Sequence, residues 1–196
     1  TPVKHEYAHC WRCHKTVIFR LTKQWFFKVE DLKEEMRKLN KKVFWQPDWA
    51  GNKWFDSWLE NLHDNSITRQ YYWGSPVPIW KCELCDNYTV IGSMEELKKL
   101  SGKLPKDIHK PWIDEVTIKC NCGGIQKRIP DILDVWIDAG TTSWTCLDYP
   151  QRTDLFKKYW PADFILEGKD QIRGWFNLLL VASMVAMKKH SYKTVY

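Results

Sequence analysis

The chain has 196 residues, 44% of them hydrophobic, which is enough to bury a core in one large or two small domains. Its formal charge of +6 favours an acidic partner such as RNA, although 30 basic residues are spread among 24 acidic ones. The longest apolar run, 175–187, falls short of the roughly 20 residues that a membrane span requires, and no export pattern is visible. We therefore exclude a membrane protein and expect a soluble protein of the cytoplasm.

Cys10 and Cys13 form the first of two Cys-x-x-Cys pairs, after a tail without periodic pattern. Two thiolates at this spacing can bind one metal ion while the backbone turns around it. Because only two ligands are present locally, we expect an incomplete half-site; His9 and His14 would complete it in the alternative interpretation. A reactive dithiol, as in redox proteins, is a third possibility.

Two strands are expected at 17–20 and 24–28, where β-branched and aromatic residues gather. The spacing of apolar residues then predicts an amphipathic helix at 29–39 and a second helix at 51–62. Trp54, Trp58 and Leu62 share one face of the second helix. We interpret this stripe as core, and a platform for nucleobases is the alternative.

Arg69 and Gln70 stand in a polar and aromatic segment, 66–74. A guanidinium and an amide can grip a phosphate or the edge of a nucleotide. A structural arginine bonded to carboxylates or backbone would also fit this pattern. The sequence leaves both interpretations of Arg69 open.

Cys82 and Cys85 form the second Cys-x-x-Cys pair, and Cys120 and Cys122 follow beside two glycines that permit a sharp turn. In a chain without an export pattern, this spacing indicates reduced thiolates that hold metal, not disulfides. Four thiolates match the tetrahedral preference of structural zinc and leave no open position for a reactive water. We predict a structural zinc ribbon, with free or redox-active thiols as the alternative.

Between the two cysteine pairs, Ser93 is expected to open a helix that ends near 100, followed by a loop at 103–111 and a strand at 112–119. From about 129 the pattern changes to alternating strands and helices. Strands are expected at 132–137, 163–166 and 192–196, with a short helix that buries Cys146 and a long helix from Asp170 to about 187. This alternation predicts half of a doubly wound sheet.

Glu167, Asp170 and Gln171 lie with Trp175 where a strand passes through a glycine turn into a helix. In a βαβ unit this is the carboxyl end of the strand, where the helix N-terminus offers free N–H groups to a ligand. Carboxylates at a helix start are more commonly caps. The pattern by itself therefore leaves capping and binding open.

Four stretches in this order resemble isoleucyl-tRNA synthetases, a family of class I aminoacyl-tRNA synthetases: HCWRC at 9–13, SITRQYYWG at 66–74, DILDVWIDAG at 131–140 and EGKDQIRGWF at 167–176. Related valine and leucine enzymes share the arginine–glutamine element, whereas the last two stretches point to isoleucine. The resemblance covers 7–196. It implies an aminoacyl-tRNA ligase that activates isoleucine with ATP and Mg, transfers it to tRNA(Ile), contains zinc, and is a cytoplasmic monomer.

The resemblance also implies roles for individual residues, none of them as an acid or base. Arg69 and Gln70 would border the catalytic cleft and the path of the tRNA 3′ end. Six residues would hold the aminoacyl-adenylate. They are Glu167, Gly168 and Asp170 at the ribose, Gln171 at the activated carbonyl, and Trp136 and Trp175 around the isoleucine side chain. Carboxylates accept from ribose hydroxyls and indole faces form an apolar slot, so the residue types agree with these roles.

Three parts are expected: a connective return segment with the first cysteine knuckle at 1–62, a zinc-ribbon insertion at 63–128, and the second half of a Rossmann-type catalytic domain at 129–196. The predicted fold class is thus α/β, preceded by an α+β connective region. The family's two ATP-binding signatures, its editing domain and the partner of the Cys10/Cys13 pair are not recognisable. We expect an inactive fragment of an active ligase. A zinc-ribbon RNA-binding module without catalysis is the alternative, and salt would weaken its binding to RNA.

Overall fold

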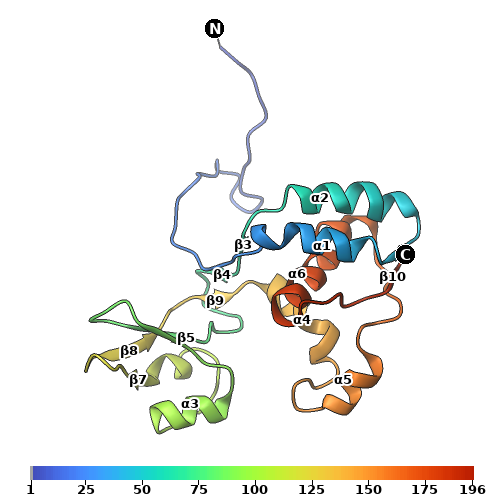
Figure 1. Cartoon of the computed structure of the whole chain (residues 1–196). Coiled ribbons are helices and arrows are strands. Elements are labelled where there is room, and N and C mark those ends of the chain that lie inside the picture. Colours follow the sequence, from blue (N-terminus) through green and yellow to red (C-terminus); the bar gives the residue numbers. More distant parts are fainter. Residues whose placement is uncertain (1) are drawn as a thin grey trace.

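Two hydrophobic cores of unequal size organise residues 2–196, the part of the chain that the computed structural model describes. The larger core joins residues 29–62 to residues 162–195, from opposite halves of the chain. The smaller core lies inside the cysteine-containing region, between residues 80 and 118. Residues 2–22 lead away from both cores and turn back on themselves between His9 and Thr16, which form an antiparallel bridge (Figure 1).

Six α-helices and four short helical turns occur in the described residues. The helices are α1 Lys33–Asn40, α2 Asp56–Glu60, α3 Met94–Ser101, α4 Val135–Thr145, α5 Thr153–Tyr159 and α6 Trp175–Met187. The turns are the 3₁₀ segments η1 Glu30–Leu32, η3 Trp112–Glu115 and η4 Lys169–Ile172, and the π-helix η2 Ala50–Phe55.

The strands are short. They are β1 Phe26–Phe27, β2 Phe44–Trp45, β3 Asn65–Ser66, β4 Thr68–Arg69, β5 Ile79–Cys82, β6 Tyr88–Val90, β7 Thr117–Lys119, β8 Ile125–Arg128, β9 Ile132–Leu133 and β10 Thr194–Val195. No helix within residues 2–196 is both long enough and apolar enough to cross a bilayer.

The helical pair predicted at 29–39 and 51–62 is confirmed: η1 and α1 form one arm, and η2 and α2 form the other. The predicted core face of the second arm is confirmed at Leu62 and wrong at Trp54. Phe55, Leu59 and Leu62 are buried, whereas Trp54 is 49% exposed and packs edge-on against Trp49. Trp58 packs against the core in part, and its buried indole N–H has no hydrogen-bond partner in residues 2–196.

A small parallel sheet carries the expected βαβ unit. β10 pairs in parallel with β2, and on its other side Ile165 forms a parallel bridge with Val195. α6 connects these two segments, and its residues from Phe176 to Met184 are all buried. The strands expected at 163–166 and 192–196 are therefore present in short form, and the chain is a mixed α/β structure.

The strand predicted at 132–137 is wrong after its first two residues. β9 pairs antiparallel with β4, outside the parallel sheet, and Asp134 then caps α4 by accepting the backbone N–H of Trp136 at 2.8 Å. Trp136 therefore lies on a helix. A carboxylate cap satisfies N–H groups that a strand would have left to a partner, and it outweighs the β-propensity of Val135 and Ile137.

Cys146, which was expected to be buried, is exposed at the end of α4. Three boundaries also differ from prediction. Residues 17–20 form no strand: Val17 N donates to Ala8 O at 3.1 Å, but Ile18 and Phe19 are exposed. The first half of the strand expected at 112–119 is the turn η3. Asp170 lies inside η4 and caps no helix, because α6 begins only after Gly174.

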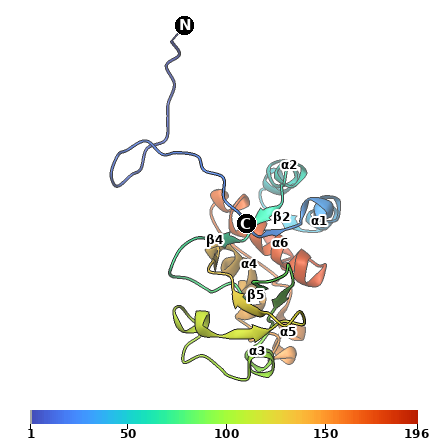
Figure 2. The ribbon, with the colours of Figure 1, turned by 90° about the vertical axis from the view of Figure 1, so that its left-hand side faces the viewer.

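The cysteine-containing region is a four-stranded antiparallel sheet in the order β6-β5-β8-β7, covered by α3. Trp80, Leu97 and Val116 fill its core, and the Trp80 indole donates to Val116 O at 2.7 Å. Figure 2 shows this sheet and α3 at one end of the molecule, α1 and α2 at the other, and α4 and α6 between them.

Candidate metal centre and ligand cavities

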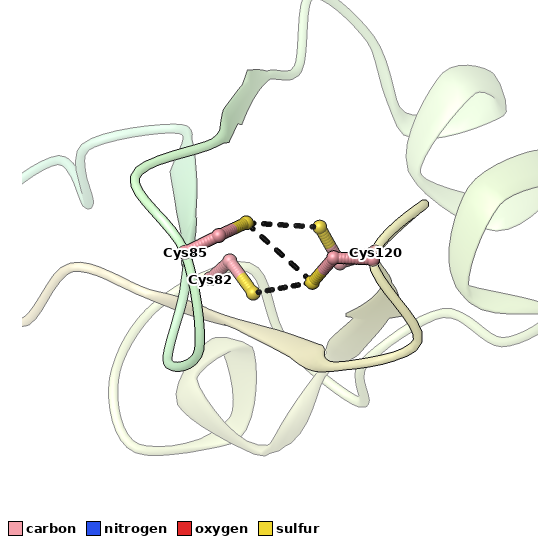
Figure 3. A group of neighbouring side chains, drawn as sticks. Cys82, Cys85 and Cys120 are labelled. Atoms are coloured by element: carbon pink, nitrogen blue, oxygen red, sulfur yellow. Dashed lines mark hydrogen bonds between the residues drawn. The ribbon is translucent and has the colours of Figure 1, made fainter.

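Four cysteine sulfurs converge at one end of the antiparallel sheet (Figure 3). Cys82 ends β5 and Cys85 lies in the turn after it, while Cys120 and Cys122 lie in the turn between β7 and β8. The sulfurs of Cys82 and Cys122 are 3.6 Å apart, those of Cys85 and Cys122 3.5 Å, and those of Cys85 and Cys120 3.7 Å. A tetrahedral ion with metal–sulfur bonds of about 2.3 Å separates its sulfurs by about 3.8 Å. The cluster therefore fits one four-coordinate metal ion.

Backbone N–H groups lie beside two of these sulfurs, whereas neighbouring thiols raise the pKa of Cys85 to about 12 and also raise that of Cys122. The pKa of Cys120 is lowered to about 6, chiefly because the backbone N–H of Cys122 stabilises the thiolate. The backbone N–H of Leu84 approaches the Cys82 sulfur at 3.4 Å. Gly124 provides the space that the Cys82 sulfur occupies, because a Cβ at position 124 would lie 3.1 Å from that sulfur. The turn is thus shaped to direct thiolates inward.

Within residues 2–196 the group of four cysteines is the one set of three or more ligand side chains close enough to share an ion, and Cys10 and Cys13 lie outside it. The His9 ring contacts Tyr7 O at 3.0 Å and Thr16 Oγ1 at 3.3 Å. Backbone groups of Cys13 and Arg12 lower the pKa of Cys10. A half-site at this pair stays a prediction.

Glu167 and Gly168 line a cavity of about 590 Å³ at the carboxyl ends of the three parallel segments. Gln46 and Trp49 enter it after β2, Lys169 from the turn after Ile165, and Tyr196 after β10. Ligands of doubly wound sheets bind at this edge, because the loops that leave parallel strands open there. The sequence interpretation omitted Gln46 and Trp49; the parallel pairing of β2 that brings them here has no local sequence signal.

Asp170 and Gln171 are held in the turn between this cavity and α6. Gln171 Nε2 donates to Asp170 Oδ2 at 2.9 Å, and Gln171 Oε1 accepts the backbone N–H of Trp175 at the same distance. A Cβ on Gly168 would lie 2.6 Å from Asp170 Oδ1, so a larger residue there would require the exposed Asp170 side chain to shift. Asp170 borders a neighbouring cavity of about 400 Å³, with Lys53, Trp54 and Arg173 in its wall.

Trp136 belongs to the first turn of α4, and Trp175, at the start of α6, is hydrogen-bonded to α4. The Trp175 indole donates to Ala139 O at 3.1 Å and approaches Thr142 Oγ1 at 3.3 Å. Trp136 lies beside Gly174, where an added Cβ would meet its Cη2 at 3.3 Å, and it lines a cavity of about 210 Å³ with Arg69 and Asp134. The structure thus divides the six predicted binding residues: Glu167 and Gly168 line the first cavity, Asp170 the second and Trp136 the third, and Gln171 and Trp175 line none of these three.

Arg69 and Gln70 are engaged with other side chains. Arg69 forms an ion pair with Asp134 and donates to Thr68 O at 2.7 Å. Gln70 donates to Asp131 Oδ2 at 3.1 Å and accepts from Gln24 at 2.9 Å. The structure favours the structural interpretation of Arg69, and its role at the tRNA 3′ end stays a prediction.

The chain matches the family model described as tRNA synthetases class I (I, L, M and V) over residues 6–196. It is 50% identical over 194 residues to isoleucine--tRNA ligase from Methanocorpusculum labreanum and 48% identical over 193 residues to the protein of that name from Archaeoglobus fulgidus. These matches cover 98% of the chain but only 18% and 19% of the two relatives.

Among solved structures, methionyl-tRNA synthetase of Mycobacterium tuberculosis bound by methionyl-adenylate aligns with a TM-score of 0.55 and 19% identity, covering 96% of this chain and 28% of that one. Its apo form aligns with a TM-score of 0.56 and 18% identity, over 96% and 29% of the two chains. At these identities the likeness concerns the fold alone.

Proposed function

The chain belongs to the class I tRNA synthetases for isoleucine, leucine, methionine and valine, and from this premise we propose that it carries part of the aminoacyl-adenylate site of an isoleucine–tRNA ligase. The relatives named isoleucine--tRNA ligase, up to 50% identical, favour isoleucine among the four amino acids. Such a ligase joins the isoleucine carboxylate to the α-phosphate of ATP. It then passes the acyl group to a ribose hydroxyl of tRNA(Ile).

The observation that carries the proposal is the position of Glu167 and Gly168 at the carboxyl edge of the parallel segments, facing the 590 Å³ cavity. An exposed carboxylate there can accept hydrogen bonds from ribose hydroxyls, and glycine lets the ligand approach the backbone. Trp136 and Trp175 would form the apolar slot for isoleucine, with Gln171 at the activated carbonyl and Asp170 beside the ribose. Placement and charge neutralisation dominate this chemistry, and the residues suit placement.

We assign a structural zinc ion to Cys82, Cys85, Cys120 and Cys122. Bound there, zinc would cross-link the turn after β5 to the turn between β7 and β8 and supply folding energy without reaction chemistry.

The proposal is tested by calorimetric titration of the chain, with its zinc content determined by elemental analysis, against a non-hydrolysable isoleucyl-adenylate analogue, isoleucyl-sulfamoyl adenosine. Glu167→Gln should weaken binding roughly tenfold, because a charge-assisted hydrogen bond becomes a neutral one. The control is Glu35→Gln, an equal change at an exposed position of α1, which should leave affinity unchanged. An unsaturable titration of the wild type, or equal affinities of wild type and Glu167→Gln, would contradict the proposal.

A further inference from the structure

We infer that Asp134 and Arg69 are positioning residues: their ion pair holds the first turn of α4 so that Trp136 stands at a defined distance from Trp175, and it thereby sets the shape of the amino-acid slot. This inference rests on the proposed function, because it assigns the slot to those two indoles. It goes further in naming which residues control the slot without touching the substrate.

The two carboxylate oxygens of Asp134 bond different partners. One oxygen, Oδ1, accepts the backbone N–H of Trp136 at 2.8 Å, and the other, Oδ2, pairs with Arg69 Nη2. Asp134 is only 5% exposed, whereas the Arg69 side chain is 39% exposed. A buried carboxylate that loses its cation is strongly destabilised, which makes this pair a firm link between β4 and α4.

Arg69 is itself fixed at its other end. Its Nη1 donates to Thr68 O at 2.7 Å and to Ser66 Oγ at 3.1 Å, so the guanidinium is bound to the β3–β4 segment. The backbone adds one more link, since Asp134 N donates to Ile67 O at 2.9 Å. A guanidinium with these partners has few donors left for a phosphate, and positioning is therefore the better assignment for Arg69 than phosphate binding.

The middle of α4 is held by a close backbone contact and a hydrogen bond. A Cβ on Gly140 would lie 2.7 Å from Leu178 O, so the backbones of α4 and α6 touch in the middle of α4. The Trp175 indole donates to Ala139 O on the same stretch. The middle of α4 thus moves with α6 and Trp175. In the first turn Ile137 packs with Leu178 of α6, and Asp134 adds the link to β4 that bears on Trp136.

Trp136 has the freedom that such a control requires. Its side chain is 43% exposed and borders the 210 Å³ cavity together with Arg69 and Gly174. Without the ion pair, the first turn keeps its contact with α6 through Ile137 but loses its side-chain link to β4. Release of the pair would widen the slot and reduce the contact with a branched side chain more than the contact with a small one.

The test compares two analogues that differ only in the side chain, isoleucyl- and glycyl-sulfamoyl adenosine. Asp134→Asn keeps an oxygen to cap α4 but removes the charge, and Arg69→Gln removes the other partner. In both variants the isoleucyl analogue should bind about tenfold more weakly and the glycyl analogue less than about twofold, because only apolar contact is lost. Arg69→Lys should recover part of the difference, since it restores the charge but not the fork.

Asp138→Asn is the matched control. It removes a carboxylate one turn further along α4, where the partner is Ser75 Oγ at 3.0 Å, and it should leave the ratio of the two affinities unchanged. An equal weakening of both analogues by Asp134→Asn and Arg69→Gln, or no weakening of either, would overturn the inference while leaving the proposed function in place.

A second measurement needs no ligand and separates the inference from the proposed function. The chain is labelled with 5-fluorotryptophan, and the ¹⁹F resonance of Trp136 is assigned through Trp136→Phe. Asp134→Asn and Arg69→Gln should both shift or broaden this resonance while that of Trp80, in the ribbon core, stays in place. An unmoved Trp136 resonance in both variants would refute the positioning role even if the wild type bound no analogue.

Discussion

At the scale of single residues, His190 shows what burial does to a titratable group. Its ring nitrogens are shielded from solvent and have no hydrogen-bond partner in residues 2–196, and the ring packs edge-on against Tyr192 at 4.4 Å. Burial lowers the pKa of His190 from 6.5 to about 4. The folded protein therefore holds this imidazole neutral at a pH at which the unfolded chain would protonate it.

We predict that this residue makes the fold sensitive to mild acid. Because the folded pKa is the lower one, the stabilisation is complete above pH 6.5 and is lost as the pH falls towards 4. Between pH 6.5 and about pH 4, the free energy of unfolding of the wild type should fall by about 3 kcal/mol more than that of His190→Phe. Urea denaturation at several pH values measures this difference. The exposed His5→Gln is the control, and parallel pH curves for wild type and His190→Phe would contradict the prediction.

Asp134 and Arg69 make a second point at this scale. The residue types were visible in the sequence, and a structural Arg69 bonded to a carboxylate was one of two interpretations left open. Which carboxylate it would meet was not visible, because the pair forms only when β4 and β9 align in antiparallel register. Residue chemistry is local information, whereas its partner is tertiary information.

At the scale of elements, caps decide where helices begin. Ser93 accepts the backbone N–H of Glu96 at 3.1 Å, and the Glu96 carboxylate accepts that of Gly92 at 2.7 Å, which confirms that Ser93 opens this helix. Asp134 likewise caps α4, and this helix begins where a strand was predicted. The motif at Ser93 was recognised because its four-residue spacing lies entirely in the sequence.

The cap gives a prediction for α3. Ser93→Ala should destabilise the ribbon by about 1 kcal/mol, because the N–H of Glu96 loses its acceptor. Ser93→Asp retains an acceptor and should be close to neutral, which makes it the matched variant. Thermal denaturation followed by the fluorescence of the ribbon's aromatic core would measure both. Equal stability of the alanine and aspartate variants would show that the cap contributes nothing.

At the scale of the whole molecule, the two hydrophobic cores are separate and differ in size. The ribbon's core consists of six buried residues, whereas the larger core collects sixteen from both halves of the chain. A core as small as the ribbon's seldom maintains a fold by itself and is commonly supported by a metal or disulfides.

We predict that removal of metal unfolds one module and spares the other. In the zinc-bound chain, a chelator should abolish the slow amide exchange of β5 to β8, while the amides of α6 and β10 keep theirs. Hydrogen exchange resolved by peptide measures both at once. Cys82→Ser should reproduce the effect without chelator, and Cys146→Ser, outside the cluster, should not. Loss of protection in both modules, or in neither, would contradict the prediction.

The sequence by itself determined the features whose cause is short-range. Periodicity and spacing predict the helices near 29–40 and 50–60, the helix cap at Ser93 and the convergence of the four cysteines. Four motifs in order indicate the family. Tertiary structure decided what depends on partners distant in the chain. It placed Gln46 and Trp49 beside Glu167, turned Trp136 onto a helix, and left residues 17–20 without a strand. The physical reason is that a cap or a periodic stripe is satisfied within a few residues, whereas a strand, an ion pair or a cavity wall exists only once its other side has folded against it.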